Sequence, residues 1–312
     1  MPIPTGLKNR NPIRCPDLLR SVPMFSSFVL SLAALRVRAA VRAIAATLVL
    51  THAPSLAQYA TTVVDYSPGT GYATEFGTGL GYTLTDSILG EPSRVTPGDF
   101  GGPVNPFNAP YLREQLLSIG AGGSLTVALA ASNDASHPYG IDFQIFGGSF
   151  FVIANGDYSG GGITDGTIYG SHTGETRISV SADGVHYFTL NPALAPSPDS
   201  LFPTRGDGNF HLPVNPALKA ADFAGLGLSD IALKYQLSGG GTGYDLDWAQ
   251  KADGTPANLT SIEFVRVDVL SGRSDLDGFA AVGAVPEPAS WALALTGLAG
   301  LLLLRRPLFD RL

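Results

Sequence analysis

The sequence predicts an all-β fold, an antiparallel β-sandwich of the jelly-roll kind, over residues 58–284. Three observations lead to it: alternating apolar and polar stretches recur between turn residues, glycine and proline are dense (38 and 23 of 312 residues), and helical periodicity is scarce. Alternation with a period of two puts every second side chain on one face of a sheet, and glycine and proline divide the chain into short strands. These 227 residues suffice for one domain with a single core.

Four stretches show the alternation best, and each is expected to bury one face in the core. The residues expected to point inward are Leu125, Val127 and Leu129 within 124–129, Phe143 and Ile145 within 142–146, Ile178 and Val180 within 176–181, and every second residue of 262–269. After the third stretch, Asp183-Gly184 is expected to supply the positive-φ positions of a tight hairpin turn. A turn of helix is expected at residues 216–223.

The first 57 residues have the pattern of a secretory signal region. An apolar run at 43–50 follows basic residues, and a small-x-small cleavage sequence, Ser55-Leu56-Ala57, precedes Gln58. Cleavage is therefore expected between Ala57 and Gln58. The region is longer than the roughly 15–30 residues of an ordinary signal peptide, so Met24 is an alternative start of translation. The basic residues before the run are Arg36, Arg38 and Arg42.

The last 28 residues, 285–312, form a module of three parts. Val285-Pro286-Glu287-Pro288 comes first, an uncharged apolar run at 289–304 follows, and Arg305-Arg306 ends the run. As a helix the run would reach ~24 Å, which is short of the ~30 Å hydrocarbon core of a bilayer. We expect a marginal single membrane helix with its basic end in the cytoplasm. A buried core helix is the alternative.

This module resembles the PEP-CTERM sorting signal of exported bacterial proteins, on the strength of its proline-flanked glutamate, apolar run and basic pair in that order. The resemblance implies that the segment holds the chain in the inner membrane until an exosortase, a membrane cysteine protease-transpeptidase, processes it near the motif. It also implies a bacterium that makes an exopolysaccharide or biofilm matrix.

Seven short stretches of the body, taken in order, are similar to a group of cell-surface proteins that often carry the same tag. The stretches are 89–94, 117–127, 140–146, 178–188, 244–247, 264–268 and 275–282. The resemblance implies a galactose-binding-like or carbohydrate-binding-module-like domain and establishes no molecular function. One departure concerns Gly147-Gly148, which stand where the group often has a Glu-Asn pair. Any site to which that pair contributes is altered in this chain.

The body between the two end segments is strongly acidic. The end segments hold three of the 26 acidic and ten of the 19 basic residues, so residues 58–284 keep 23 acids and 9 bases, a charge of −14. This charge repels nucleic acid and anionic lipid. The single cysteine, Cys15, lies in the signal region, so we expect no disulfide or thiolate site in the mature domain.

Two Asp-x-Asp pairs are the candidate metal ligands, Asp245 with Asp247 and Asp275 with Asp277. In an extended segment both carboxylates of such a pair share one face, and a hard cation relieves their repulsion. Ca²⁺ with 6–8 oxygen ligands is the cofactor that fits. The alternative is that these aspartates cap strand ends and turns in solvent.

Aromatic residues are the candidate ligand contacts, because sugar-binding sandwiches stack pyranose faces on exposed rings. Trp248 is the only tryptophan of the body, and Tyr244 is close to it in sequence. A core position is the alternative for both. Further candidates are Tyr82, Tyr158, Tyr169 and Tyr187.

No catalytic residue is assigned. The body has no Gly-x-Ser-x-Gly elbow, no His-x-x-x-His zinc spacing and four scattered histidines. We therefore expect an exported cell-surface or extracellular-matrix protein, with a non-catalytic binding or structural domain associated with exopolysaccharide. Its expected partners are the exosortase-type enzyme, the inner membrane before processing and the polysaccharide, without nucleic acid. The alternative is a hydrolase or lyase acting on that polysaccharide.

Overall fold

The computed structural model describes residues 59–99, 101–170 and 174–283. The predicted signal region, the cleavage position at Ala57 and Gln58, and the whole 285–312 module with Pro286, Glu287, Arg305 and Arg306 lie outside the described residues. Within the described part, no helix is long and apolar enough to cross a membrane.

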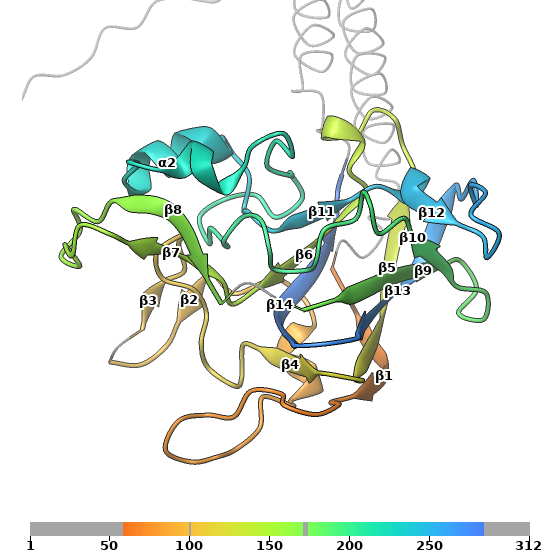
Figure 1. Ribbon diagram of the computed structural model, residues 1–312, viewed down its shortest axis with the longest axis horizontal. Coiled ribbons are helices and arrows are strands. Elements are labelled where there is room, and N and C mark those ends of the chain that lie inside the picture. The colour runs from red at the N-terminus through yellow and green to blue at the C-terminus, as the bar shows by residue number, and fades with distance from the viewer. Residues whose placement is uncertain (1–58, 100, 171–173, 284–312) are drawn as a thin grey trace, which may run out of the picture. The chain divides into compact units, whose positions relative to one another are not determined.

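Two antiparallel sheets make up the centre of the described domain (Figure 1). The six-stranded sheet has the order β1 (Thr62–Ser67), β5 (Ser124–Ser132), β13 (Ser261–Val269), β9 (Thr176–Ser181), β10 (Phe188–Leu190) and β12 (Ala249–Gln250). The four-stranded sheet has the order β11 (Thr242–Tyr244), β6 (Phe143–Gly147), β14 (Arg273–Ala281) and β4 (Leu117–Gly120).

Two ribbons and several short helices complete the domain. The ribbons pair β2 (Val95–Thr96) with β3 (Gly102–Pro103) and β7 (Phe150–Ile153) with β8 (Thr164–Tyr169). The helices are η1 (Thr85–Ile88), η2 (Pro138–Gly140), η3 (Ala220–Phe223), α2 (Leu228–Tyr235) and η4 (Leu246–Trp248). The prediction of an all-β antiparallel sandwich is therefore confirmed for the described residues.

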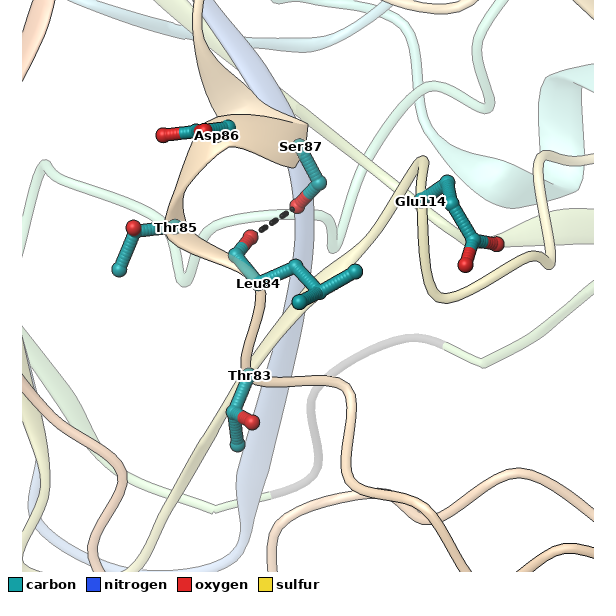
Figure 2. A pocket seen from close by; sticks show the side chains of 6 residues that line it. All are labelled: Thr83, Leu84, Thr85, Asp86, Ser87 and Glu114. Atoms are coloured by element: carbon teal, nitrogen blue, oxygen red, sulfur yellow. Dashed lines mark hydrogen bonds between the residues drawn. The ribbon is translucent and has the colours of Figure 1, made fainter.

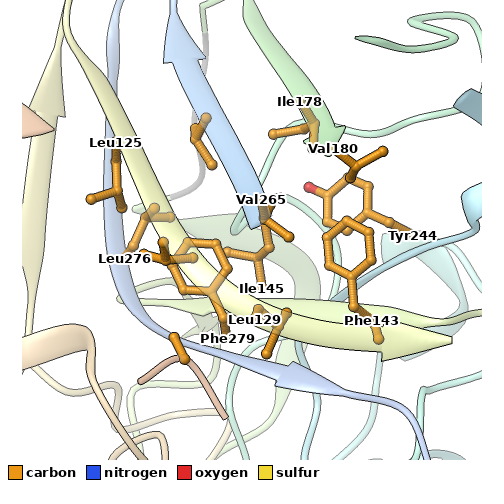
Figure 3. Close-up of a cluster of buried hydrophobic side chains, with 14 of the residues drawn as sticks. Leu125, Leu129, Phe143, Ile145, Ile178, Val180, Tyr244, Val265, Leu276 and Phe279 are labelled. Atoms are coloured by element: carbon orange, nitrogen blue, oxygen red, sulfur yellow. The ribbon is translucent and has the colours of Figure 1, made fainter. Parts of the chain in front are cut away.

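The main core lies between the two sheets, as the alternation predicts (Figure 3). Leu125, Val127 and Leu129 of β5 are at most 1% exposed, and they belong to the same buried cluster as Phe143 and Ile145 of β6. Burial of such side chains is the main stabilising contribution to a domain of this kind. The inward positions predicted in β9, Ile178 and Val180, are also buried.

Strict alternation fails in β13. Its pairing with β5 shifts between Ile262 and Phe264, which marks a β-bulge. Because a bulge inserts one residue, Ile262 and Val265 both face the core while Phe264 is half-buried. A period-two pattern without a break would have placed Ile262 and Phe264 on the same face.

The β9–β10 hairpin forms, but its turn differs from the one predicted. Phe188 pairs with Val180, so a longer loop than a two-residue turn joins the strands. Gly184 has a φ of 73°, whereas Asp183 is not among the residues of positive φ. The Asp183 carboxylate instead accepts hydrogen bonds from the backbone N–H groups of Val185 and His186, which closes the loop as an aspartate turn.

A second, smaller core includes side chains of α2 and of the β7–β8 ribbon, two elements that Figure 1 shows near each other. The expected helical turn at 216–223 is found as η3, and α2 follows it without having been predicted. Ile231 and Tyr235, one helical turn apart, are the buried residues of α2. The buried residues of this core are Phe151, Phe202, Val214, Phe223, Ile231 and Tyr235.

The first and last described segments lie side by side. Tyr59 forms an antiparallel bridge with Ala280, and the Ala60 amide donates to the Phe279 carbonyl at 3.2 Å. The Val282 amide then donates to the Asp142 carbonyl at 2.8 Å. In an antiparallel pairing of this register, the chain enters and leaves the domain at the same end of β14.

Removal of a core side chain tests this architecture. Leu125→Ala should lower the free energy of unfolding by about 2–5 kcal/mol, because it leaves a cavity between the sheets. Val64→Ala on β1, where the side chain is 54% exposed, should change it by less than about 0.5 kcal/mol. Urea unfolding followed by fluorescence measures both. Equal effects of the two substitutions would contradict the assigned burial.

Candidate functional site

Asp245 and Asp247 do not form the predicted carboxylate pair on one face of an extended segment. The chain turns into η4 at Leu246, so the period-two argument does not hold here. Asp245 instead caps η4 and accepts from the Asp247 amide at 2.7 Å, while Asp247 accepts from Asn133 Nδ2 at 2.8 Å. The alternative from the sequence, in which these aspartates cap turns and do not bind a metal ion, therefore describes Asp245.

Asp275 and Asp277 do lie on a strand, β14, where the pairing with β6 shifts between Leu276 and Gly278. Asp275 accepts from Ser118 Oγ at 2.6 Å and from Arg273 Nε at 3.0 Å. Asp277 is 2% exposed and accepts from both the amide and the hydroxyl of Ser93, at 2.8 and 2.7 Å. Each carboxylate is thus bound by donors of the protein itself.

The described residues contain no group of three or more histidine, cysteine, aspartate or glutamate side chains that could hold a metal ion. The calcium site stays a prediction, and neither Asp-x-Asp pair gives it geometric support.

Tyr244 and Trp248 belong to the main core. Tyr244 is fully buried, its ring is stacked on Phe143 with centroids 5.1 Å apart, and its hydroxyl donates to the Pro196 carbonyl at 3.1 Å. A ring in this position offers no face to a ligand. Trp248 is half-buried and packs against the same core. Both residues therefore contribute to the core, which was the alternative to a role in ligand contact.

Two exposed aromatic side chains named among the candidates lie on the β7–β8 ribbon. Tyr169 is 65% exposed and its ring is tilted against Phe150 at 5.3 Å, while Tyr158 in the connecting loop is 79% exposed. Two of the further candidates from the sequence therefore present ring surface to solvent.

His137 and Asp142 form a buried pair that the sequence did not single out. His137 Nδ1 lies 2.8 Å from Asp142 Oδ1, and the side chains are 3% and 1% exposed. Asp142 also accepts from the Leu246 amide at 2.8 Å, and desolvation raises the pKa of its carboxyl. A His-carboxylate pair is part of many hydrolase sites, but this one is closed to solvent and ties the η2 loop to η4.

Asp199 is the second buried acid that the sequence did not reveal. It is 5% exposed with a φ of 57°, and its Oδ1 accepts from the amide and hydroxyl of Ser149 at 3.1 and 2.6 Å. A Cβ added at Gly147 would lie 2.3 Å from its carboxyl carbon. Gly147 therefore leaves the room that the Asp199 side chain occupies.

A cavity lies between the β2–β3 ribbon and α2, and we refer to it as the arginine groove. Its volume is about 590 Å³. Val95, Pro103 and Leu228 give it apolar surface, and Asn105 and Ser229 add polar groups. The residues that line it are Arg94, Val95, Pro103, Val104, Asn105, Arg205, Gly206, Asp207, Leu228, Ser229 and Ala232.

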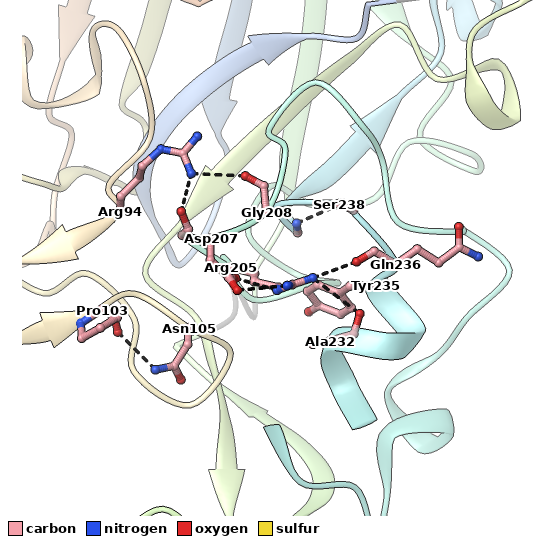
Figure 4. Close-up of polar contacts among 12 residues, drawn as sticks. Arg94, Pro103, Asn105, Arg205, Asp207, Gly208, Ala232, Tyr235, Gln236 and Ser238 are labelled. Atoms are coloured by element: carbon pink, nitrogen blue, oxygen red, sulfur yellow. Dashed lines mark hydrogen bonds and ion pairs between the residues drawn. The ribbon is translucent and has the colours of Figure 1, made fainter. Parts of the chain in front are cut away.

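Arg94 fixes one side of the arginine groove (Figure 4). Its guanidinium donates to the carbonyls of Gly206 and Gly208, pairs with Glu91 at 2.6 Å and lies 4.5 Å from the centre of the Phe210 ring. Such a side chain is held in one conformation by charge-assisted bonds and a cation–π contact.

Arg205 fixes the other side and supports α2 (Figure 4). It donates to the Gln236 carbonyl at 2.8 Å, at the carboxyl end of the helix, and pairs with Asp207 at 2.6 Å. A cation at this end also offsets the helix dipole. Gly206 is needed between them, because a Cβ there would lie 2.7 Å from the Arg94 carbonyl oxygen.

Two further cavities are smaller than the arginine groove. One, of about 360 Å³, is a hollow beside η1, lined by Thr83, Leu84, Thr85, Asp86, Ser87 and Glu114 (Figure 2). The other, of about 460 Å³, lies between β9, β10 and the loop that follows β10. Of the three, the arginine groove has the most extensive network of fixed polar groups.

A scan of protein-family models and a search of curated proteins found nothing that matches this chain.

The buried Asp277 makes a measurable contribution to the pH dependence of stability. Desolvation raises its pKa from 3.8 to about 7 despite two hydrogen bonds. The folded state therefore binds more protons than the unfolded state between these values, so the contribution is greatest at low pH and falls as the pH rises from 4 to 7. The free energy of unfolding that is lost over this pH window through Asp277 is roughly 3–5 kcal/mol.

Asp277→Asn should remove this slope, since the amide can accept from the Ser93 amide and donate to its hydroxyl without ionising. Urea unfolding of both proteins between pH 4 and 8 measures the difference. Parallel stability curves for the two would show that Asp277 titrates normally.

Proposed function

We propose that this chain is an exported protein of the cell surface or extracellular matrix, whose sandwich domain binds exopolysaccharide without changing it chemically. The observation that carries the binding part is the arginine groove of about 590 Å³. Polar side chains held in place by ion pairs stand there beside apolar surface. Sugars present both hydroxyl groups and C–H faces, so a preorganised site of mixed character suits them.

The charge of the groove bears on the class of polysaccharide. Arg94 and Arg205 are each paired with a carboxylate, that of Glu91 and that of Asp207. The groove therefore adds no net positive charge to a domain that carries −14. A strongly acidic protein repels a polyanion, so a neutral or weakly charged glycan is the ligand that fits.

A hydrolase or lyase acting on the same polysaccharide is the alternative. A glycosidase requires two acids beside the bond that is cut. Of the described residues that line the arginine groove, Asp207 alone carries a carboxylate. Asp199 and Asp277, whose pKa values burial raises most, line none of the three cavities. The groove is thus better suited to binding than to cleavage.

The location rests on the sequence of the two ends. The export signal ending at Ala57, the Pro286-Glu287-Pro288 motif, the apolar run and Arg305-Arg306 support an inner-membrane intermediate that an exosortase-type enzyme processes. The galactose-binding-like character of the sandwich and its place in the cell-surface group belong to the same proposal.

Glycan binding is expected to depend on the groove wall. Residues 58–284, applied to a glycan array with and without Ca²⁺, should bind a subset of neutral glycans. Leu228→Asp places a charge in the wall and should weaken binding at least about tenfold, or roughly 1.4 kcal/mol. Leu233→Asp is the matched control on the same helix, because Leu233 is 75% exposed and does not line the groove.

The control should bind like the wild type. A requirement for Ca²⁺ would support the predicted metal. Loss of binding with Tyr169→Ala but not with Leu228→Asp would move the site to the β7–β8 ribbon. No binding under either condition would leave a structural role in the matrix.

The sorting proposal predicts the fate of a motif variant. With Glu287→Ala and Pro288→Ala together, the chain should accumulate unprocessed in the inner membrane of a host that makes the exosortase. Membrane fractionation and immunoblotting measure this, with Leu308→Ala as the control beyond the basic pair. Normal release of the motif variant would contradict an exosortase-type signal.

A further inference from the structure

The cavity of about 460 Å³ has one wall made by the loop that follows β10, residues 191–200. The opposite side is formed by β9 and β10 themselves, including Arg177 and Thr189. The loop residues that line the cavity are Pro192, Ala195, Pro196 and Ser197. We refer to this loop as the wall loop.

The wall loop is held at both ends and near its middle. Its first residue, Asn191, donates its amide to the Trp248 carbonyl at 2.8 Å, and the Pro196 carbonyl accepts from the Tyr244 hydroxyl at 3.1 Å. At the far end, Asp199 accepts from the amide and hydroxyl of Ser149, at 3.1 and 2.6 Å. Asp199 is therefore the side chain that fastens this end of the wall to the rest of the domain.

The second oxygen of Asp199, Oδ2, is buried and has no hydrogen-bond partner among the described residues. Its carboxyl carbon lies 2.3 Å, and the Asp275 carbonyl oxygen 2.5 Å, from the position that a Cβ at Gly147 would take. The two groups are thus no more than 4.8 Å apart, the total of those two distances. Both accept hydrogen bonds, so an ionised Asp199 would face an acceptor, whereas a neutral acid can donate to it.

The groups around Asp199 also disfavour its charge. Desolvation raises the pKa of its carboxyl well above the ordinary value, and the carboxylates of Asp275 and Asp277 on β14 act in the same direction. Tyr244 of β11 is the other titratable group close to it, and the burial of this tyrosine keeps it neutral. Arg273, on β14, pairs with Asp275.

We propose that Asp199 is carried as the neutral acid in the folded protein and that its proton fastens the wall loop, so that the cavity opens when the pH rises and this proton is lost. An acid with a raised pKa in the folded state contributes most to stability at low pH, and this contribution is lost as the pH rises through the folded-state value. Opening follows because loss of the proton leaves a buried charge whose Oδ2 has no donor among the described residues, and such a group draws water or moves to solvent.

Hydrogen–deuterium exchange of the full chain in a mild detergent tests the proposal. Protection factors of peptides that cover 191–200 should fall at least about tenfold between pH 5.5 and pH 9, as a switch of about 1.4 kcal/mol requires. Asp199→Asn keeps a donor on the side chain and cannot ionise, so its protection should stay within about twofold over the same range. Asp277→Asn, the matched control, should keep the wild-type fall.

A wild-type loop with constant protection, or an equal fall in Asp199→Asn, would overturn the proposal. If Asp199→Asn does not fold, infrared difference spectroscopy of a chain with both Asp142→Asn and Asp277→Asn decides the matter, because Asp199 is then the one buried acid among the described residues whose pKa burial raises. That chain should show a protonated-carboxyl C=O band at pH 7.5. Absence of the band would show that Asp199 is ionised at this pH, and this result would overturn the proposal.

Discussion

Burial of the apolar faces of two antiparallel sheets against each other is the interaction on which the other features of this domain depend. β5, β13 and β9 supply one face, and β6 and β14 supply the other. The strands are short and the chain is rich in glycine, so local preference alone fixes little of the structure. The core therefore sets the register of the strands, and the bulges in β13 and β14 mark where that register has to shift.

The same burial creates the acids that are most perturbed. Asp199 and Asp277 lie at the margin of the core, where water is excluded, and serine hydroxyl and amide groups supply their partners. Ser149 and Ser93 satisfy these carboxyls in part without neutralising them. These two acids are held by hydrogen bonds, whereas the buried Asp268 pairs with Arg177 and Arg266.

In the arginine groove, charged side chains join segments that are far apart in the sequence. Arg205 reaches both the last carbonyls of α2 and the carboxylate of Asp207, so a single side chain joins the helix to the loop beneath it. Arg94 joins the segment before β2 to the same loop by binding the carbonyls of Gly206 and Gly208. The contact of Arg205 that shapes one side of the groove thus also fixes the end of α2, whose residues Ile231 and Tyr235 belong to the smaller core.

The sequence predicted the fold well where one physical rule governs it. Leu125, Val127, Phe143 and Ile145 are buried as period-two alternation requires. The rule failed at Ile262 and at Asp245, because a bulge and a 3-10 turn change the period without any residue type that announces them.

The candidate site could not have been predicted in the same way. The arginine groove joins residues 94–105 to residues 205–232, and Asp199 reaches Ser149 across fifty positions. These contacts depend on how the sheets and the smaller core pack, and no local pattern records them. In the sequence, Gly147 shows only that a side chain is missing, and it does not show that Asp199 fills the space.

The bridge between Tyr59 and Ala280 has a mechanical consequence. Because the two ends of the domain leave from the same end of one antiparallel pair, a force that separates them breaks its hydrogen bonds one after another, and it does not load them together in shear. If both ends of the domain were held, the force between them would act at this bridge and would not extend across the two sheets. The residues next to this bridge are therefore the first to respond when the two ends are pulled apart.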